Sequence, residues 1–562
     1  MALRPSLPWR LPNTAAMSIG HTHTPHEPAR VGADLTVVDV DALIARNRYA
    51  ADVRATIVEE ELLPAGLLNR LELQYPQYST LRERSPFLFE PNQRFSGVNG
   101  FRRVLTVLDR HGITLGHQAE RELFIEVYRF LATSHVLNTI DWRHVETDPL
   151  FQLTFPQPGM LPADAVEAYV AAGTVEGRTR VVDTYRARTN PHDGKQLLNR
   201  PWIEGEDGQR EVVAGSQHKY PQCQLLFDRT TQNCFAYCTY CFRHAQVRGD
   251  HDMFVQDDVA QLHRYLRQHP EVTDVLITGG DAAMMPAERF AAYALPILSD
   301  PSLCHIRTIR FGSRALAYDP ELVLSDRFTP MLKLFRTVVD HGVQFAWMAH
   351  FSTPREVLNP STIAAVRRLQ RQGVVIRSQS PVMNHISLFQ GADGRVDVDK
   401  SAQNWIDLAN LMAALRIGFH SMYCARPTGE HHYFAVPLAE IERVASKVYR
   451  SLPSINRPSR YLSMTTSAGK ISILGTADVH GEKVFALKFT QARNMEWLDR
   501  VFLAKYDAHQ KNVDLLEPFD SQTFFFRDEL AGIERVLAEA LSGGPAGGPL
   551  RDGSCEDRPG AE

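Results

Sequence analysis

Residues 233–243 read NCFAYCTYCFR, and this short stretch decides both the fold and the chemistry that we expect. It holds Cys234, Cys238 and Cys241, three of the seven cysteines in the chain, in the spacing Cys-x3-Cys-x2-Cys. A structural zinc site normally takes four ligands from paired CxxC elements, and no second pair is present. Three thiolates around a [4Fe-4S] cluster leave one iron open to a small molecule. We therefore predict that these three cysteines are the metal ligands of such a cluster.

The composition is that of a globular protein without a strong charge preference. A chain of 562 residues exceeds one typical core, so we expect two or three domains. The net charge is -4, which predicts no nucleic-acid partner and no attraction to an anionic membrane. The longest apolar run, 290–298, is too short for a membrane span and contains a proline. The other four cysteines are scattered, which favours a reducing, cytoplasmic setting over a disulfide framework.

The residue pattern changes along the chain and predicts five segments. Residues 1–35 lack the apolar core of a secretory signal and are expected to form a disordered leader. Residues 36–210 show helical periodicity and are expected to form a helical N-terminal domain and linker. Residues 211–455 carry the main fold, and 456–540 form an α+β extension with a hairpin. The Gly- and Pro-rich stretch 541–562 is expected to be a disordered tail.

The main segment alternates between short β-rich runs and amphipathic helices. The polar stretch 190–221, which has neither period, is expected to be an irregular linker before the first strand. The candidate strands are 222–227, 274–278, 306–311, 344–349, 373–378 and 416–423, and candidate helices between them include 255–269, 329–342 and 401–415. This alternation indicates βα units and a parallel sheet. The predicted fold class is α/β, a partial (β/α)6 TIM-like open barrel, with the site on loops after the strands.

The second predicted strand ends in a turn that suits a ligand. The stretch VLITGGDAA places Gly279, Gly280 and Asp281 there, where glycines admit a close ligand and a carboxylate can meet an ammonium group. With the cysteine spacing and Tyr240 before the last cysteine, this resembles the radical S-adenosylmethionine superfamily. The resemblance implies that the open iron binds S-adenosylmethionine, that the Gly-Gly-Asp turn meets its methionine part, and that Tyr240 also contacts this cofactor.

More of the chain resembles one family, the lysine 2,3-aminomutase family. The similar stretches lie within about 215–490 and include HKYPQCQLLF, CFAYCTYCFRH, LITGGDA, IRFGSRA, MAHFSTPRE, VIRSQSPV, FHSMYCARPTGEHHYFAVPL and SAGKISIL, while TDPLFQLTFP lies further upstream. The resemblance implies an isomerase that moves the α-amino group of an amino acid to its β-carbon. It implies a [4Fe-4S] cluster, S-adenosylmethionine and pyridoxal 5′-phosphate as cofactors, an external reductant, and a possible homo-oligomer.

The family pattern also assigns roles to single residues. Lys470 matches the lysine that forms a Schiff base with pyridoxal phosphate, so it is the predicted catalytic residue. Arg243 matches the arginine that holds the substrate carboxylate, for which a guanidinium has suitable geometry. Two further pairs are implied, for the cofactor phosphate and for the S-adenosylmethionine pocket: Lys219 with Tyr220, and His350 with Gln379.

The chain departs from the lysine-specific pattern where that pattern has two substrate-binding aspartates. Leu388 or Ser387 stands at one position and Ser463 at the other. Neither side chain can pair with an ammonium group, and leaving that charge desolvated costs several kcal/mol. We therefore expect a substrate other than lysine.

Other departures leave two alternatives open. The glycine run before Lys470 is reduced to TSAG, and Ser472 replaces the usual proline. The same scaffold could thus serve another hydrogen-abstraction reaction without pyridoxal phosphate. Cys555 stands alone where the family has a zinc-binding group, so a zinc clip is not expected to hold a dimer. A non-catalytic iron-sulfur protein is the alternative from another class, although an open iron suits it badly.

Overall fold

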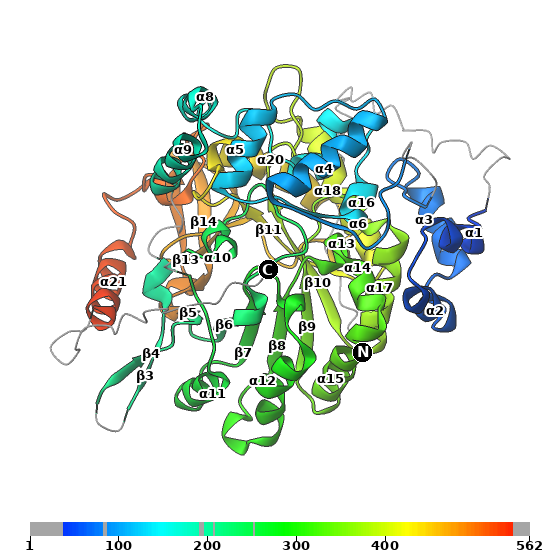
Figure 1. Ribbon diagram of the computed structural model, residues 1–562. Helices are drawn as coiled ribbons and strands as arrows, with labels where there is room; N and C mark the ends of the chain where they lie inside the picture. The colour runs from blue at the N-terminus through cyan, green and yellow to red at the C-terminus, as the bar shows by residue number, and fades with distance from the viewer. Residues whose placement is uncertain (1–36, 82–86, 190–195, 206–207, 251–252, 543–562) are drawn as a thin grey trace, which may run out of the picture. The chain divides into compact units, whose positions relative to one another are not determined.

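One mixed sheet of eleven strands organises the chain (Figure 1). The structure is a computed structural model that describes residues 37–81, 87–189, 196–205, 208–250 and 253–542. The predicted leader and nearly all of the predicted tail lie outside the described residues. Hydrogen-bonded neighbours follow the order β15-β14-β13-β12-β11-β10-β9-β8-β7-β6-β5, so strands that follow one another in the chain are also adjacent in the sheet.

Six consecutive strands run parallel in this sheet. They are β6 (Cys223–Phe227), β7 (Asp274–Thr278), β8 (Thr308–Gly312), β9 (Gln344–Ala349), β10 (Val375–Val382) and β11 (Gly418–Cys424). Each predicted strand corresponds to one of them, and the largest difference is at the end of β10, which runs on to Val382. The α/β class is confirmed, whereas the open-barrel form of the sheet stays a prediction.

Helices connect successive parallel strands, as parallel pairing requires. Along the chain they are α10 (His244–Arg248), α11 (Val259–Gln268), α12 (Ala287–Ser299), α13 (Ala315–Tyr318), α14 (Pro320–Leu324), α15 (Thr329–Asp340), α16 (Pro354–Val357), α17 (Pro360–Arg371) and α18 (Val398–Ala414), with α19 (His431–Phe434) and α20 (Leu438–Ser451) after β11. Figure 1 shows α12, α15 and α17 beside the strands that they connect.

The two faces of the parallel sheet differ in burial. Ile277 and Phe311 point to one face and are at most 1% exposed, beneath the connecting helices. Asp274, Arg310 and Gln379 alternate with such residues along their strands and are only half-buried. Parallel sheets are normally covered on both faces. A polar, half-buried face is therefore where a ligand can lie.

The N-terminal region is mostly helical, as its periodicity predicts. It contains α1 (Val40–Arg46), α2 (Ala51–Glu59), α3 (Ala65–Gln74), α4 (Gly97–Arg110), α5 (Gln118–Val127), α6 (Ser134–Thr139), α7 (Pro149–Thr154), α8 (Ala163–Ala171) and α9 (Val175–Arg188), with a small pair of strands, β1 (Arg94–Ser96) and β2 (Leu131–Thr133). The described residues from Val38 onward group into one compact unit, and the finer domain boundaries stay a prediction.

This region contacts the segment that carries the three cysteines. The backbone N–H of Tyr237 donates to the carbonyl of Leu131, and that of Thr239 donates to the carbonyl of Leu153, both at 2.9 Å. Leu153 belongs to α7, in the stretch TDPLFQLTFP. The N-terminal helices thus help to fix the backbone of the cysteine segment.

The stretch predicted to be an irregular linker contains strands, so that prediction is wrong for the part that the structure describes. It forms the hairpin β3 (Trp202–Glu204) and β4 (Arg210–Val212), and then β5 (Ser216–Tyr220). Strand β5 pairs antiparallel with β6 and ends the sheet. Its polar residues do not alternate with apolar ones, so the periodicity of the sequence gave no indication of a strand.

The C-terminal extension continues the same sheet. Strand β12 (Ser463–Thr465) runs parallel to β11 and antiparallel to β13 (Gly469–Val479). The predicted hairpin is formed by β13 and β14 (Glu482–Ala492), followed by β15 (Val501–Lys505) and α21 (Arg527–Leu541). Its turn contains His480 and Gly481, both with positive φ, which suits a tight hairpin. Lys470 is thereby placed on the main sheet.

No helix in the described residues is both long and apolar enough to cross a bilayer. The apolar run 290–298 lies within α12, which includes Pro296 and packs against the sheet through Phe290.

Candidate active site

The cysteine loop, residues 232–243, leaves β6 through the short helix η3 (Arg229–Thr231). All three of its thiols are free and partly exposed. The carbonyl of Thr231 accepts the backbone N–H groups of Gly280 at 2.8 Å and Asp281 at 3.1 Å. The loop after the first parallel strand is thus bound to the turn after the second.

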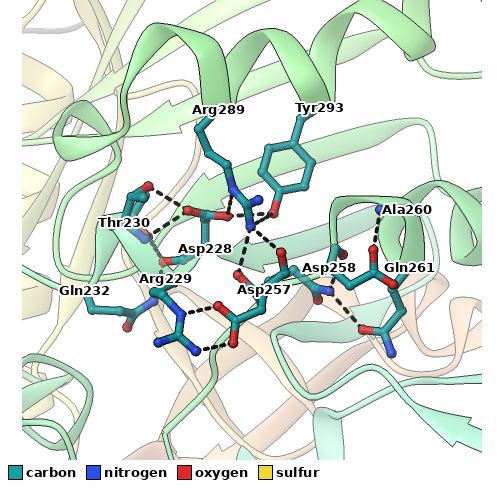
Figure 2. Close-up of polar contacts among 12 residues, drawn as sticks. Asp228, Arg229, Thr230, Gln232, Asp257, Asp258, Ala260, Gln261, Arg289 and Tyr293 are labelled. Atoms are coloured by element: carbon teal, nitrogen blue, oxygen red, sulfur yellow. Dashed lines mark hydrogen bonds and ion pairs between the residues drawn. The ribbon is translucent and has the colours of Figure 1, made fainter. Parts of the chain in front are cut away.

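A buried carboxylate anchors the start of this loop (Figure 2). Asp228 is 0% exposed and lies directly after β6. It accepts hydrogen bonds from the N–H of Thr230 at 2.9 Å, from Nε of Arg289 at 2.7 Å and from the hydroxyl of Tyr293 at 2.6 Å. Arg289 and Tyr293 belong to α12. The charged pair therefore joins the beginning of the cysteine loop to a helix that packs on the sheet.

The two glycines after β7 are required by close packing of the cysteine loop. Gly279 has φ +149°, and a Cβ there would lie 2.3 Å from Oγ1 of Thr231. A Cβ on Gly280 would lie 2.5 Å from the carbonyl oxygen of Asn233 and 2.9 Å from Sγ of Cys234. Side chains at these positions would displace the first cysteine.

Both carboxylate oxygens of Asp281, the third residue of this turn, accept hydrogen bonds from the backbone. Its Oδ1 accepts the N–H of Ala283 at 2.9 Å, and its Oδ2 accepts the N–H of Arg314 at 2.8 Å. Burial raises the pKa of Asp281 to about 6 against the opposing effect of these hydrogen bonds. In this geometry Asp281 joins the ends of β7 and β8, and its direct contact with a cofactor stays a prediction.

A buried network surrounds the second cysteine. The hydroxyl of Tyr318 lies 2.9 Å from Sγ of Cys238. Arg314 donates to the hydroxyl of Tyr240 at 2.8 Å and to a carboxylate oxygen of Glu356 at 2.6 Å. Because Arg314 is 7% and Glu356 2% exposed, this ion pair is stabilised by further hydrogen bonds rather than by water. The network places a cation and a phenol close to one thiol.

His350 and Gln379, predicted for the S-adenosylmethionine pocket, lie on neighbouring parts of the sheet. Nε2 of His350 is 3.2 Å from the hydroxyl of Tyr240. Burial, with Arg314 nearby, lowers the pKa of His350 well below its usual value, so this imidazole is neutral. Gln379 accepts a hydrogen bond from the hydroxyl of Tyr423 at 3.5 Å.

The three cysteines are not the compact group of possible metal ligands found in the described residues. Within the described ranges, one group of His, Cys, Asp and Glu residues has its ligand atoms all within 4.8 Å of one another, namely His218, His269 and Glu271. The three cysteines do not form such a group. Tetrahedral zinc with Zn–S bonds of about 2.3 Å brings its sulfur atoms to about 3.8 Å from one another. The assignment of the three thiols to a polynuclear cluster stays a prediction.

Lys470 lies on β13, where it pairs with Thr465 and Gln491. Its Nζ is 3.5 Å from the hydroxyl of Tyr423 and 5.9 Å from the ring centroid of Tyr220. Burial lowers the pKa of Lys470, and nearby guanidinium groups lower it further. An amine with a lowered pKa is more often neutral and nucleophilic near neutral pH.

Several hydroxyl groups near Lys470 are buried without a hydrogen-bond partner in the described part of the chain. They include Oγ of Ser463 and Ser472 and the phenol of Tyr220. Ser463 and Ser472 are opposite each other on β12 and β13, on the face that carries Lys470. Burying such a group costs about 1–3 kcal/mol. A polar molecule bound beside Lys470 would satisfy these groups, so the site fits a cofactor such as pyridoxal phosphate.

Lys219 lies near the start of the strand that carries Lys470. Its Nζ donates to the carbonyl of Thr466, in the turn before Lys470. Its ammonium group also lies 5.7 Å from the ring centroid of Tyr220. The predicted phosphate-binding pair therefore lies next to the strand that carries Lys470, and its contact with phosphate stays a prediction.

Arg243 lies at the end of the cysteine loop and turns back over the sheet. It donates to Oγ1 of Thr278 at 2.6 Å, and its guanidinium stacks 4.8 Å from the ring centroid of Phe227. Burial lowers the pKa of Arg243 to about 10, with a contribution from nearby Arg426, so it remains a cation at neutral pH. The position is suitable for a carboxylate.

The predicted residues gather at two places on one sheet. The cysteines, Tyr240, the Gly-Gly-Asp turn, His350 and Arg243 lie at the C-terminal ends of parallel strands, and Lys470, Tyr220 and Gln379 lie near Tyr423. The sequence analysis missed Asp228, Arg314, Glu356 and Tyr423, which support these groups. An aspartate directly after an apolar strand was a signal for Asp228, but nothing local indicated the others.

The described chain thus has a mixed α/β sheet with three cysteines after its first parallel strand and a Gly-Gly-Asp turn after its second. No protein-family model matches the chain. A putative L-lysine 2,3-aminomutase of Aquifex aeolicus is 29% identical over 269 residues, 48% of this chain and 66% of the relative. The L-lysine 2,3-aminomutase of Clostridium subterminale is 29% identical over 39% of this chain and 47% of the relative.

A glutamate 2,3-aminomutase of Clostridioides difficile is 28% identical over 30% of this chain and 37% of its own length. The chain thus spans less than two thirds of the length of these curated relatives. The chain is therefore similar to 2,3-aminomutases over part of its length and of theirs.

Proposed function

We propose that the chain is a radical S-adenosylmethionine, pyridoxal-phosphate-dependent 2,3-aminomutase that acts on an amino acid other than lysine. One observation carries the proposal. Hydrogen bonds lead from the cysteine loop through Tyr240 to His350, directly after β9, and from Lys470 through Tyr423 to Gln379 on the neighbouring strand β10. A substrate held between them would face both cofactors. The open-barrel form of the sheet is part of the same proposal.

The cysteine loop would hold the [4Fe-4S] cluster through its three thiols, next to the Gly-Gly-Asp turn that Thr231 joins to the loop. Such a cluster, reduced by an external donor, supplies the electron that cleaves S-adenosylmethionine and generates a 5′-deoxyadenosyl radical. The protein's own part is to fix the thiols through Asp228 and to keep water away with the N-terminal helices. The backbone bonds from Tyr237 and Thr239 to that region support this role.

Lys470 would hold pyridoxal phosphate, which stabilises an unpaired electron while the amino group changes carbon. Its lowered pKa favours the neutral amine that attacks a carbonyl. Tyr423 lies 3.5 Å from Nζ and can accept or return a proton there. Burial would raise the pKa of Tyr423, but Lys470 and Arg460 outweigh it, so the net shift is downward.

The two positions where the lysine-specific pattern has aspartates support a different substrate. Leu388 is fully buried among apolar side chains, and Ser463 is buried and uncharged. An ammonium group placed there would be desolvated without a counter-charge, at a cost of several kcal/mol. A relative named for glutamate is consistent with a family that accepts more than one side chain.

The experiment is to add pyridoxal phosphate to the anaerobically reconstituted protein, reduce it with borohydride, and locate the pyridoxyl group by peptide mass spectrometry. We expect an adduct on Lys470 that Lys470→Arg removes and the matched β14 variant Lys488→Arg retains. Portions of the same preparations kept free of borohydride, given S-adenosylmethionine, a reductant and amino acids, should release 5′-deoxyadenosine. A loaded cluster with deoxyadenosine release but no adduct would overturn the pyridoxal-dependent assignment and favour a different hydrogen-abstraction reaction on this scaffold.

A further inference from the structure

Two guanidinium groups share one aromatic ring beside the cysteine loop. Phe242 follows the last cysteine directly and is 36% exposed. The guanidinium carbon of Arg243 lies 5.2 Å from its ring centroid, and that of Arg426 lies 4.7 Å from it. The two cations are therefore no more than about 10 Å apart. Arg426 comes two residues after β11 ends, at the same edge of the sheet as the cysteine loop.

The oxygens named next to this arginine pair are neutral or already hydrogen-bonded. Arg243 donates to two neutral oxygens, those of Thr278 and Gly279. The acid in the segment of Arg426 is Glu430, whose carboxylate accepts the hydroxyls of Tyr128 and Tyr185 instead. Arg426 makes further contacts within the chain, so a ligand carboxylate would share its guanidinium rather than find it unpaired.

The positive character extends along the same face toward Lys470. Arg310 and Arg460 both act electrostatically on Lys470. Asp274 is an acid of this face, but it is already paired with Arg310 at 2.6 Å. A substrate with a second ammonium group would therefore meet like charges, whereas a second carboxylate would meet opposite ones.

We infer that the substrate is an amino acid with a carboxylate in its side chain, with Arg243 binding the α-carboxylate and Arg426 the side-chain carboxylate. This deepens the proposed function and rests on it. Arg426 is then the residue that determines specificity, and both guanidinium groups lie against the ring of Phe242. Charge-assisted bonds of this kind select an acid over its amide, because the amide keeps the α-carboxylate for Arg243 but presents an uncharged group to Arg426.

The test compares binding of L-glutamate with its neutral isostere L-glutamine, and of L-aspartate with L-asparagine, by calorimetric titration of the pyridoxal-phosphate-treated protein. We expect at least one acid to bind about 10- to 100-fold more tightly than its amide, the range that hydrogen bonds to charged groups give. Arg426→Gln should remove this ratio while leaving amide affinity within about threefold. Arg336→Gln, on the outer surface of α15, should leave the ratio unchanged. Equal or undetectable affinity for acid and amide overturns the inference.

A second measurement distinguishes a substrate carboxylate from the cofactor phosphate, which is also anionic. The pyridoxyl adduct on Lys470 should form to the same extent in Arg426→Gln as in the parent protein. A lower adduct yield with an unchanged acid-to-amide ratio would assign the pair to phosphate and overturn the inference. Failure of the aminomutase proposal would look different, because the acid could still bind selectively while neither the adduct nor 5′-deoxyadenosine formed.

Discussion

The edge of the sheet that carries the cysteines and the face that carries Lys470 are built differently. At the edge, the carboxylates of Asp228, Asp281 and Glu356 each accept hydrogen bonds from at least two donors. Near Lys470, the hydroxyls of Ser463 and Ser472 are buried without partners in the described residues. The three carboxylates at the cysteine edge are thus paired within the protein, whereas these hydroxyls on the Lys470 face are left for a ligand to pair.

This difference has a physical reason. Cluster ligands must be held at fixed positions before iron arrives, because a misplaced thiolate cannot bridge to the others. A bound organic cofactor brings its own hydrogen-bonding groups, so the protein can leave matching groups open at a cost in stability. The first region should therefore respond to mutation mainly through cluster loading and folding, and the second mainly through ligand binding.

The largest expected effect comes from removing one cluster ligand. In Cys238→Ser we expect the cluster absorbance, the bound iron and sulfide, and 5′-deoxyadenosine release all to fall to background. The loop is held by Asp228 and by backbone bonds rather than by the cluster, so unfolding of the metal-free protein should change by less than about 1 kcal/mol. The matched control is Cys304→Ser, because Cys304 is an exposed free thiol outside the loop. A Cys238→Ser protein with full iron and sulfide would exclude Cys238 as a ligand.

The next largest effect should come from the anchor of the loop. Asp228→Asn leaves Arg289 partly buried without its counter-charge, so we expect the free energy of unfolding to fall by about 3 kcal/mol. Iron loading should fall with it, because the start of the cysteine loop loses its contact with α12. Chemical denaturation and iron analysis measure the two effects.

The matched control for Asp228 lies in the same view (Figure 2). Asp257 forms an exposed ion pair with Arg229, with side chains 53% and 62% exposed. Exposed pairs contribute about 0–1 kcal/mol, so Asp257→Asn should be nearly neutral. Equal effects of the two substitutions would mean that burial of Asp228 does not anchor the loop.

Sequence analysis predicted the cysteine edge better than the Lys470 face because the two depend on different ranges of the chain. The three cysteines lie within eight residues, and their spacing alone indicates their chemistry. The Gly-Gly-Asp turn follows an apolar strand, which local pattern can also identify. The six parallel strands are short apolar runs separated by amphipathic helices, so their alternation was visible as well.

The supporting residues could not be predicted because they meet only in three dimensions. Arg314 and Glu356 are more than forty residues apart in the chain, yet they form an ion pair, and Arg314 also donates to the hydroxyl of Tyr240. Tyr423 and Lys470 come together only because β12 joins β11 to β13. Strand β5 was not predicted, because its residues are mostly polar and show no alternation of apolar and polar side chains. It is a strand because it pairs with β6. The resemblance to the aminomutase family indicated Lys470, but only the structure identified the residues around it.

A smaller effect should appear in the pH dependence of the Lys470 face. Burial lowers the pKa of His420 to about 3, with Arg460 and Lys470 adding to the shift, against about 6.5 in an unfolded chain. Between these values the unfolded chain binds a proton that the folded protein does not, so stability is lost as pH falls. We expect His420 to account for about 2 kcal/mol of the loss between pH 7 and pH 5.

The measurement is the free energy of unfolding across that range for the parent protein and for His420→Asn. The difference between the two should shrink, or change sign in favour of the variant, as the pH is lowered. Parallel curves would show that His420 does not titrate differently on folding. Binding of pyridoxal phosphate should leave this slope in place unless the phosphate lies against His420, in which case the slope becomes shallower.

The smallest expected effect is a change in the stability of the ligand-free protein, which should fall for a substitution at the cysteine edge and rise for one on the Lys470 face. Oγ1 of Thr231 donates to two carbonyl groups, those of Asp228 and Thr278, so Thr231→Val should destabilise the ligand-free protein by about 1 kcal/mol. Ser463→Ala removes a buried hydroxyl without a partner, so it should stabilise the ligand-free protein by up to about 1 kcal/mol. Thermal unfolding without cofactor measures both. With pyridoxal phosphate present, Ser463→Ala should lose that gain in stability, because the bound cofactor can no longer form a hydrogen bond with the Ser463 hydroxyl. If Ser463→Ala destabilises the ligand-free protein as Thr231→Val does, the hydroxyl already has a partner, and the Lys470 face is as complete on its own as the cysteine edge.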